Sequence, residues 1–327
     1  MAINRKQRVT LKDVAKEAGV NFTLVSKLIN RNPQARMTDE TRARIAEAIK
    51  KLDYRPSASA RTLRYGRSKT VGLVSGDLTN AYCAHAADLA IREMREFGYQ
   101  LLIAFGGRES ENDTFRSLLA RDVDGIIYLG SGTPRCDALP CPFILNDRRL
   151  PSCSEVTLDL DKSLDDALSR VSGRVAGLFF ENSLWKDAFS RVAFKRAIEA
   201  QIYSLSLDQK IRAEEIRSVI ETKPEVIMTS GWHTMTMLLE LLDESFVGYT
   251  PKLIVHANCR GPFLSDKRIC GVIYSSSSDL IKKTCAALVS LIETSSSDAV
   301  SLSIPTKFLP SNTQGFKSLY SRHFCLT

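Results

Sequence analysis

Apolar positions recur at helical spacing in the first thirty residues of the chain. A first helix is predicted over residues 11–18, beginning after Thr10 and ending at Gly19, which suits a left-handed turn. A second helix is predicted over residues 22–30, with Asn21 as its N-cap. The apolar positions of the two helices are Leu11, Val14, Ala15, Ala18, Leu24, Val25 and Leu28. Two short helices joined by a tight turn that contains glycine indicate a helix-turn-helix.

A third helix, predicted over residues 39–52, would close a small core beneath the first two. The stretch after it is rich in small residues and too short to be a stable helix alone. We therefore predict a small all-α helix-turn-helix head over residues 1–56. Residues 57–69 are predicted to be a hinge or linker that becomes ordered only when it packs against something else.

From residue 70 onwards, apolar runs of strand length alternate with helical stretches. Strands are predicted at 71–74, 99–104, 123–129, 142–147, 175–180, 226–229, 253–256, 271–273 and 306–309. Helices are predicted at 83–97, 110–121, 186–200, 234–243 and 278–293. This alternation is typical of parallel sheets covered by helices on both faces. The body, residues 70–327, is predicted to contain two doubly wound subdomains, about 70–160 and 161–290, with the C-terminal part crossing back. Ligands of such sheets bind at the carboxyl ends of the strands, so the cleft between the subdomains is the expected pocket.

Charge is distributed unevenly along the chain. Residues 1–70 contain 17 Lys or Arg and 6 Asp or Glu and therefore carry +11, whereas the rest of the chain carries −3. A basic head on a nearly neutral body is what contact with phosphate groups requires. The second helix of a helix-turn-helix lies in the major groove. Charge and motif together predict binding to double-stranded DNA.

The outward face of the second predicted helix would meet the edges of the bases. Lys27 can donate to guanine, and Thr23 and Ser26 can bond to several bases. Phe22 can contact a thymine methyl group. The predicted DNA-binding residues of the head are Thr10, Asn21, Phe22, Thr23, Ser26, Lys27 and Asn30. The alternative for Lys27 is an ordinary solvated lysine.

Other functional classes lack a matching pattern. No run of about 18 apolar residues predicts a membrane span, and the polar N-terminus predicts no secretory signal. We therefore expect a cytoplasmic protein with no membrane partner. The four His and eight Cys are scattered, which predicts reduced thiols and no metal site. No phosphate loop, nucleophile elbow or other catalytic pattern is visible, so we expect neither enzyme activity nor a cofactor.

Three segments of the head follow one another in a specific order: residues 10–20 (TLKDVAKEAGV), 25–30 (VSKLIN) and 54–63 (YRPSASARTL). Together they resemble the head of the lactose-repressor/galactose-repressor family of bacterial transcription regulators. The resemblance implies that the residues reading bases in the major groove are Phe22, Thr23 and Lys27.

The same resemblance implies a hinge helix over residues 57–64 that contacts DNA through Ser57, Ala60 and Leu63. Leu63 would enter the minor groove, where apolar side chains open base steps. The alternative for Leu63 is a core leucine. Leu24 departs from the small polar residue usual in the family, which leaves the detailed operator preference open.

Parts of the body resemble the periplasmic-binding-protein-like body of the same family. They include residues 80–82, 98–99, 122–127 and 156–159. The resemblance implies a small effector, often a sugar or purine, bound in the cleft, and dimerisation through the body. The predicted effector-binding residues are Tyr82, Asp147, Arg191, Trp232 and Asn258.

Several of these positions depart from the family pattern. Trp232 and Asn258 stand where acidic residues usually bond sugar hydroxyls, and Arg191 lies one residue out of step. Because buried hydroxyl groups would lose their acceptors, we expect weak or no binding of common free hexoses. Trp232 could stack on a flat or apolar ligand, or it could fill the cleft.

The function that these observations favour is a homodimeric, sequence-specific transcription regulator acting as a repressor. It would bind a near-palindromic operator and respond to a small molecule in the cleft. One alternative is a DNA binder of the same fold with a degenerate cleft and no effector control. Another is a solute-binding protein or enzyme built on the same body, which a DNA-binding head and the missing catalytic pattern argue against.

Overall fold

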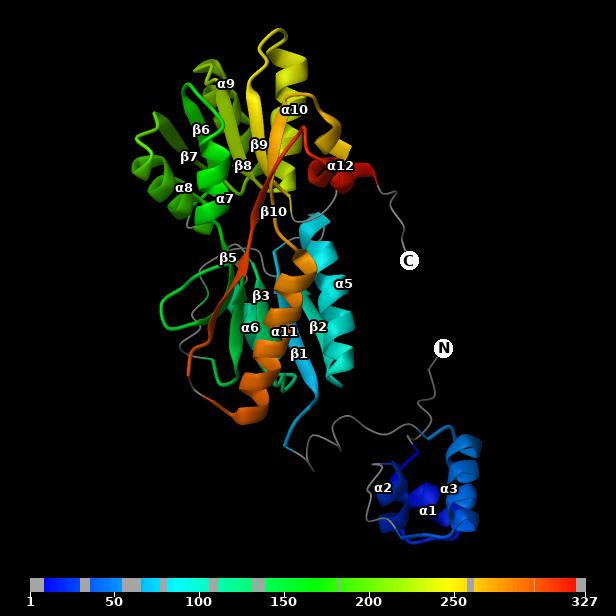
Figure 1. Cartoon of the computed structure of the whole chain (residues 1–327). Helices are drawn as coiled ribbons and strands as arrows, with labels where there is room; N and C mark the ends of the chain where they lie inside the picture. Colours follow the sequence, from blue (N-terminus) through cyan, green and yellow to red (C-terminus); the bar gives the residue numbers. More distant parts are fainter. Residues whose placement is uncertain are drawn as a thin grey trace, which may run out of the picture. The chain divides into compact units, whose positions relative to one another are not determined.

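The computed structural model describes residues 9–29, 36–54, 66–76, 81–105, 111–130, 134, 139–181, 183–257, 262–296 and 298–321 (Figure 1). The chain divides into two compact units, the head at Met1–Ser68 and the body at Lys69–Thr327. Predicted site residues that lie outside the described residues are Asn30, Ser57, Ala60, Leu63 and Asn258. The predicted roles of these five residues stay predictions.

The described part of the head contains three helices. They are α1 (Leu11–Ala18), α2 (Phe22–Ile29) and α3 (Asp39–Lys51). Their buried apolar side chains make one small core: Val14, Ala15, Ala18, Val25, Ile45 and Ala48. The predicted helix-turn-helix and the third helix that closes its core are confirmed.

Local hydrogen bonds fix where the helices of the head begin and end. Thr10 and Asp13 form a reciprocal capping box at the start of α1. Gly19 ends α1 with φ 62°, a left-handed conformation that glycine adopts at little cost. Asn21 Oδ1 accepts the backbone N–H of Thr23 at 2.8 Å, which starts α2. The predicted caps at Thr10, Gly19 and Asn21 are therefore confirmed.

The first sheet of the body is entirely parallel, in the order β11-β5-β4-β3-β1-β2. Its strands are β1 (Thr70–Ser75), β2 (Gln100–Phe105), β3 (Gly125–Leu129), β4 (Phe143–Asn146), β5 (Ser154–Asp159) and β11 (Ser301–Pro305). Helices α5 (Ala81–Glu96) and α11 (Ser277–Thr294) lie side by side on one face, and α6 (Glu111–Leu119) covers the other (Figure 1). Successive residues of β3 serve both faces, because Ile127 belongs to the α5/α11 core and Ile126 and Tyr128 to the α6 core.

The second sheet has the order β12-β10-β9-β8-β6-β7, and only its edge strand β12 is antiparallel. Its strands are β6 (Val175–Phe180), β7 (Ala200–Leu205), β8 (Val226–Ser230), β9 (Lys252–Ala257), β10 (Ile269–Tyr274) and β12 (Lys307–Pro310). Its α-helices are α7 (Asp161–Leu168), α8 (Leu184–Lys195), α9 (Gln209–Glu221), α10 (Trp232–Ser245) and α12 (Gln314–Ser321). A short 3-10 helix, η2, spans Pro262–Ser265. The fold is therefore an all-α head with a body of two doubly wound subdomains.

The predicted boundary of the second subdomain, 161–290, needs a correction. Helix α11 packs on α5, β3, β4 and β5, so it covers the first sheet rather than the second. Its apolar side, which includes Leu280, Cys285 and Leu288, is fully buried there. Periodicity reveals that a helix has an apolar side, but not which sheet this side covers.

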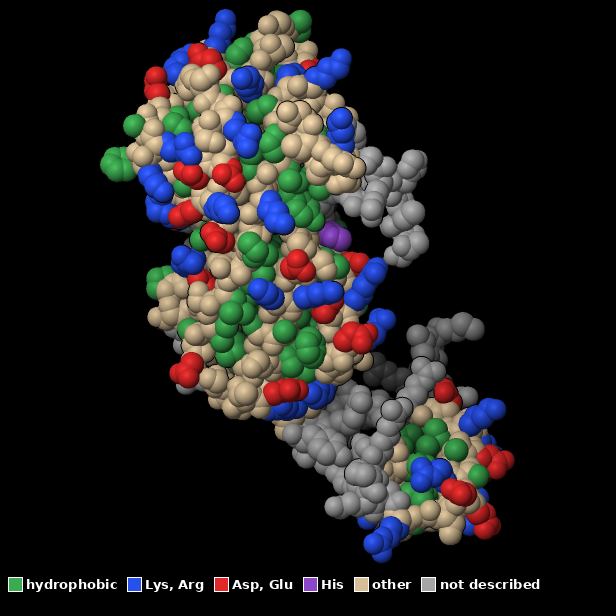
Figure 2. Space-filling model, viewed as in Figure 1, with side chains coloured by type: hydrophobic (Ala, Val, Ile, Leu, Met, Phe, Trp, Pro, Cys, Tyr) green, Lys and Arg blue, Asp and Glu red, His purple; other side chains and the backbone are tan. Residues whose placement is uncertain are grey.

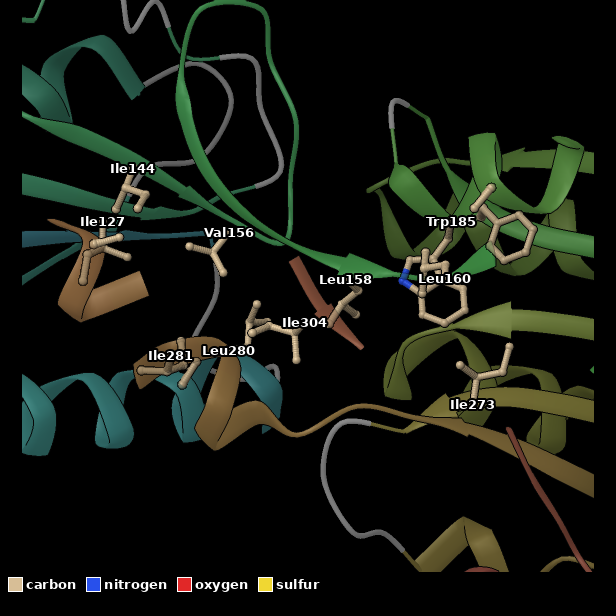
Figure 3. Packing of buried hydrophobic residues seen from close by; sticks show 14 of the residues in the cluster. Ile127, Ile144, Val156, Leu158, Leu160, Trp185, Ile273, Leu280, Ile281 and Ile304 are labelled. Atoms are coloured by element: carbon tan, nitrogen blue, oxygen red, sulfur yellow. The ribbon is translucent and has the colours of Figure 1, made fainter. Parts of the chain in front are cut away.

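The chain passes between the subdomains next to residues 160, 275–276 and 306. Two of these segments are bonded to each other. The Thr306 hydroxyl donates to the carbonyl of Asp159 at 2.6 Å, and Ser163 Oγ lies 2.5 Å from Thr306 Oγ1. Apolar packing is continuous across the same region, where Leu158 and Ile304 lie between the side chains of the two subdomains (Figure 3).

The cysteines do not all match the expectation of reduced thiols. Cys153 is disulfide-bonded, whereas Cys83, Cys141, Cys270 and Cys285 are free. Sequence spacing alone did not indicate this bond, because spacing does not show which cysteines meet in the fold. On the face of the body seen in Figure 2, Lys and Arg side chains are interspersed with Asp and Glu, as expected for its small net charge.

Candidate nucleic-acid interface and effector site

The recognition helix predicted from the sequence is α2, and its beginning is exposed. The aromatic side chain of Phe22 is 54% exposed, and Thr23 is also exposed. Lys27 follows one turn later and is partly exposed. Single exposed apolar side chains are common on protein surfaces, so the exposure of Phe22 shows that it is accessible and does not by itself require a partner. The structure thus leaves Phe22, Thr23 and Lys27 accessible to a partner.

Ser26 does not lie on the exposed face that we predicted for it. It is only 4% exposed, next to the fully buried Val25. Val25 and Ser26 are the buried residues of α2, and both lie on the side of this short helix that packs into the head. The exposed reading face is therefore narrower than predicted, and Ser26 contributes to packing.

The predicted effector residue Tyr82 is part of a buried polar chain. Asn146, at the end of β4, donates from Nδ2 to the Tyr82 hydroxyl at 2.7 Å. Thr284 Oγ1 on α11 lies 2.9 Å from Asn146 Oδ1. The sequence did not indicate Asn146 and Thr284, because nothing in their local pattern distinguishes them from other polar residues. Their contacts form only when α5, β4 and α11 pack together.

Asp147 follows β4 in a left-handed conformation with φ 56°. Its backbone N–H donates to the carbonyl of Val156 at 2.8 Å, which fixes the turn. Its Oδ1 atom is buried and has no hydrogen-bond partner among the described residues. Burial raises the pKa of this carboxyl group to about 7, against the opposing effect of Arg148. Asp147 can therefore either donate or accept a hydrogen bond near neutral pH.

Three hydroxyl groups resemble Asp147 in being buried without a hydrogen-bond partner in the described part of the chain. One of them, Tyr99 Oη, precedes β2, whereas the other two lie at the carboxyl ends of strands. These two are Ser75 Oγ, at the end of β1, and Thr234 Oγ1, in the first turn of α10 after β8. Ser75, Asp147 and Thr234 all lie at the carboxyl ends of parallel strands, where open α/β sheets bind ligands. Buried polar atoms are normally paired, so these three are candidate contacts for a polar ligand at this edge.

A second cluster at the carboxyl edge of the second sheet joins His256, Ser275 and Trp185. His256 Nε2 lies 2.8 Å from Ser275 Oγ, and the His256 and Trp185 rings are 4.4 Å apart. Burial lowers the pKa of His256 to about 3, so the imidazole is neutral. No sequence pattern indicated this cluster, because Trp185 lies 71 residues and Ser275 lies 19 residues from His256 along the chain.

The other two predicted effector residues are less closely tied to this edge. Arg191 is exposed on α8, where its Nη2 lies 2.7 Å from Asp161 Oδ1. The buried side of α8 is filled by apolar residues such as Phe189 and Val192, which turns Arg191 outward. Trp232 is the first residue of α10, after Gly231 with φ 95°, and the position of its side chain is not described.

Two other kinds of feature are missing from the described residues. No helix there is long and apolar enough to cross a membrane. The described His, Cys, Asp and Glu side chains also form no group of three that could hold a metal ion.

Residues 10–57 match the family model of bacterial regulatory proteins, lacI family. The chain is 39% identical to catabolite control protein A of Staphylococcus xylosus over 124 residues, 37% of each chain. It thus matches little more than a third of that relative's length. The structure of the lac repressor dimer bound to operator and the anti-inducer ONPF has a TM-score of 0.76 at 16% identity, covering 94% of this chain and 99% of that one. The CelR–cellobiose complex has a TM-score of 0.64 at 18% identity, covering 94% and 100%. At these identities the structural likeness shows the fold.

Proposed function

We propose that the chain is a transcriptional repressor, because residues 10–57 of its head match the family model of bacterial regulatory proteins, lacI family, and part of the chain is similar to a catabolite control protein. The observation that carries the proposal is the exposed start of α2, held behind the tight turn at Gly19 in a strongly basic head. A helix in this arrangement enters the major groove, and the basic charge binds phosphate groups. Such a repressor acts in the cytoplasm, where bacterial DNA lies.

The proposed DNA site has two half-sites and is bound by a homodimer. Among the described residues, one head would present Phe22, Thr23 and Lys27 to base edges, which is too few contacts for a unique genomic site. Two heads related by a two-fold axis would read a near-palindrome. The hinge residues Ser57, Ala60 and Leu63 would add minor-groove contacts. Thr10 and Asn21, which cap the starts of α1 and α2, would contact the DNA backbone.

The proposed control input is a small molecule bound at the carboxyl edges of the two sheets. The unpaired oxygens of Ser75, Asp147 and Thr234 support this proposal, because a polar ligand would satisfy them. Tyr82, Arg191, Trp232 and Asn258 are proposed to lie around the same ligand. The neutral His256 and the Trp185 ring favour a ligand with an apolar or flat face over a free hexose. ONPF and cellobiose are the small molecules in the structures of the two relatives.

The decisive experiment is selection of DNA from a random-sequence duplex library by the full-length protein, followed by footprinting. The expected result is enrichment of one near-palindromic sequence with two protected half-sites. Enrichment of no sequence would contradict sequence-specific binding. Footprinting of the selected duplex with and without cell metabolites then tests the control input. An unchanged footprint with every metabolite fraction would favour a regulator of the same fold without effector control.

A further inference from the structure

The turn between α1 and α2 contains two backbone carbonyl groups that lie beyond the normal helix bonds. At the end of α1, Gly19 N–H donates to the Lys16 carbonyl at 3.2 Å, and Val20 N–H donates to the Ala15 carbonyl at 3.0 Å. These bonds form the usual glycine-ended cap. They leave the carbonyls of Ala18 and Gly19 to find partners elsewhere.

Both carbonyls accept hydrogen bonds from Arg44, a residue of α3 that is 26 and 25 positions further along the chain. Arg44 Nε and Nη2 donate to the Ala18 carbonyl at 3.2 and 2.5 Å, and Nη2 also donates to the Gly19 carbonyl at 3.1 Å. A planar guanidinium suits such paired acceptors, and its positive charge is favourable at the negative end of a helix. Arg44 therefore bonds the turn itself rather than a side chain beside it.

The space around Gly19 matches this arrangement. A Cβ atom added to Gly19 would lie 3.1 Å from Arg44 Nη2, and the φ of +62° would strain any other residue. The glycine thus allows the guanidinium to approach the backbone closely. Asn21, the cap of α2, comes only two residues after Gly19, so the turn determines the direction in which α2 leaves.

We propose that Arg44 is a positioning residue for sequence reading, which holds the turn so that Phe22, Thr23 and Lys27 reach the base edges. This inference rests on the proposed function. Base contacts need accurate placement of side chains, whereas phosphate contacts tolerate small displacements. Loss of Arg44 therefore lowers the preference for the selected sequence more than it lowers binding to DNA in general.

Lys51 provides a matched control on the same helix. It lies two helical turns after Arg44 and also connects α3 to α1, with its Nζ 2.5 Å from Glu17 Oε1. This contact joins two side chains and leaves the turn carbonyls untouched. Lys51→Met removes the same charge from α3 as Arg44→Met does, and it removes one bridge between the same two helices.

The test uses the full chain and two DNA duplexes, the sequence that the wild type enriches from a random library and a shuffled version of it. Dissociation constants are measured for both at one salt concentration. Arg44→Met is expected to lower the ratio of the two affinities by about tenfold, because several charge-assisted hydrogen bonds are lost. Arg44→Lys is expected to recover part of the ratio, since an ammonium group still donates to the turn. Lys51→Met should leave the ratio within about twofold of the wild type.

A second measurement, hydrogen exchange of the full chain without DNA, tests the same geometry independently of DNA binding. Arg44→Met should speed exchange in residues 11–29 more than Lys51→Met does. Equal exchange in the two variants, or equal loss of the affinity ratio, would overturn the positioning role. So would a loss by Arg44→Met that is the same for both duplexes. Failure of the wild type to enrich any sequence would instead reject the proposed function, while the exchange result would still decide whether Arg44 holds the turn.

Discussion

The head and the body differ in the distance along the chain over which their important contacts are made. The core of the head joins residues 14 to 48, and its caps connect positions three residues apart or fewer. The body joins β5 to β11 and places Tyr82, Asn146 and Thr284 in one polar chain. The surface proposed to read DNA is therefore built locally, whereas the edge proposed to receive the effector requires the whole body to be folded. We therefore expect that a change in one unit leaves the stability of the other unit almost unaltered.

The largest effect is expected from Ile45→Ala, which tests this independence. Ile45 is fully buried in the small core of the head. Replacement of a large buried aliphatic side chain by alanine costs about 2–5 kcal/mol, which is comparable to the whole stability of so small a unit. We expect loss of DNA binding together with an unchanged melting transition of the body, measured by calorimetry. A lower melting temperature of the body would show that the two units fold as one.

Sequence patterns predicted the head more completely than the body. Caps, a glycine turn and 3.6-residue periodicity fixed α1, α2 and α3 nearly to their ends, because each signal acts within a few residues. The same reasoning put Ser26 on the exposed side, since two short turns give too few positions to define the direction of packing.

In the body, the alternation of apolar runs with helical stretches predicted two helix-covered sheets. It missed the strands β5, β7 and β11 and the helices α7, α9 and α12. The predicted helix 186–200 runs into what is the start of β7, because Ala200–Leu205 alternates too weakly to stand out. The assignment of α11 to the second subdomain failed because crossing of the chain between sheets leaves no local signal. The His256, Ser275 and Trp185 cluster was missed because its members meet only when α8, β9 and the end of β10 pack together.

The next effect concerns the body and is a dependence of stability on pH. Asp147 has a pKa of about 7 in the folded protein, raised from 3.8 by burial. The folded state therefore retains a proton that the unfolded chain releases in this window. Its contribution consequently destabilises the body as pH rises from 3.8 to about 7, by at most about 1.4 kcal/mol per pH unit, and is constant above that range.

Asp147→Asn removes this titration while keeping the size of the side chain. Urea unfolding of both proteins between about pH 5 and about pH 8 should show the variant gaining stability relative to the wild type up to about pH 7. The other titrating groups are common to both proteins and cancel in the difference. A difference that does not change with pH would mean that the Asp147 carboxyl group is solvated, and would remove it from the candidate effector edge. DNA binding by the head is expected to be unaffected in the absence of a ligand.

A smaller effect is expected from Lys27→Ala in the head. Lys27 is proposed to donate to a guanine, so its loss should cost about 1–3 kcal/mol of binding and relax selectivity at one base pair of each half-site. The control is Lys12→Ala. Lys12 is an exposed lysine on α1, so this substitution removes the same charge and leaves α2 unaltered. It should weaken binding to all sequences alike. Base-by-base competition assays distinguish the two results, and uniform weakening by both variants would reduce Lys27 to a phosphate contact.

The smallest effect on stability is expected from Arg191→Ala. This variant tests whether Arg191, which is exposed on one helix, takes part in an effector site that only the folded body assembles. Arg191 pairs with Asp161 on the surface, and such exposed ion pairs stabilise proteins little. The melting temperature of the body should fall by less than about 3 °C. Arg196→Ala is the control for the response to a ligand, because Arg196 follows α8 and also pairs with an aspartate, Asp165. The Arg196 pair has two hydrogen bonds and is less exposed, so this variant is expected to lower the melting temperature more than Arg191→Ala does.

If Arg191→Ala alone abolishes the response of the footprint to a metabolite, Arg191 turns from Asp161 to the ligand when the site is filled. If neither variant changes the response, the surface pair is all that Arg191 forms, and the effector is held by Asp147 and the buried hydroxyl groups. That outcome would place the effector contacts entirely on groups that only the assembled body brings together, in contrast to the locally built reading face of the head.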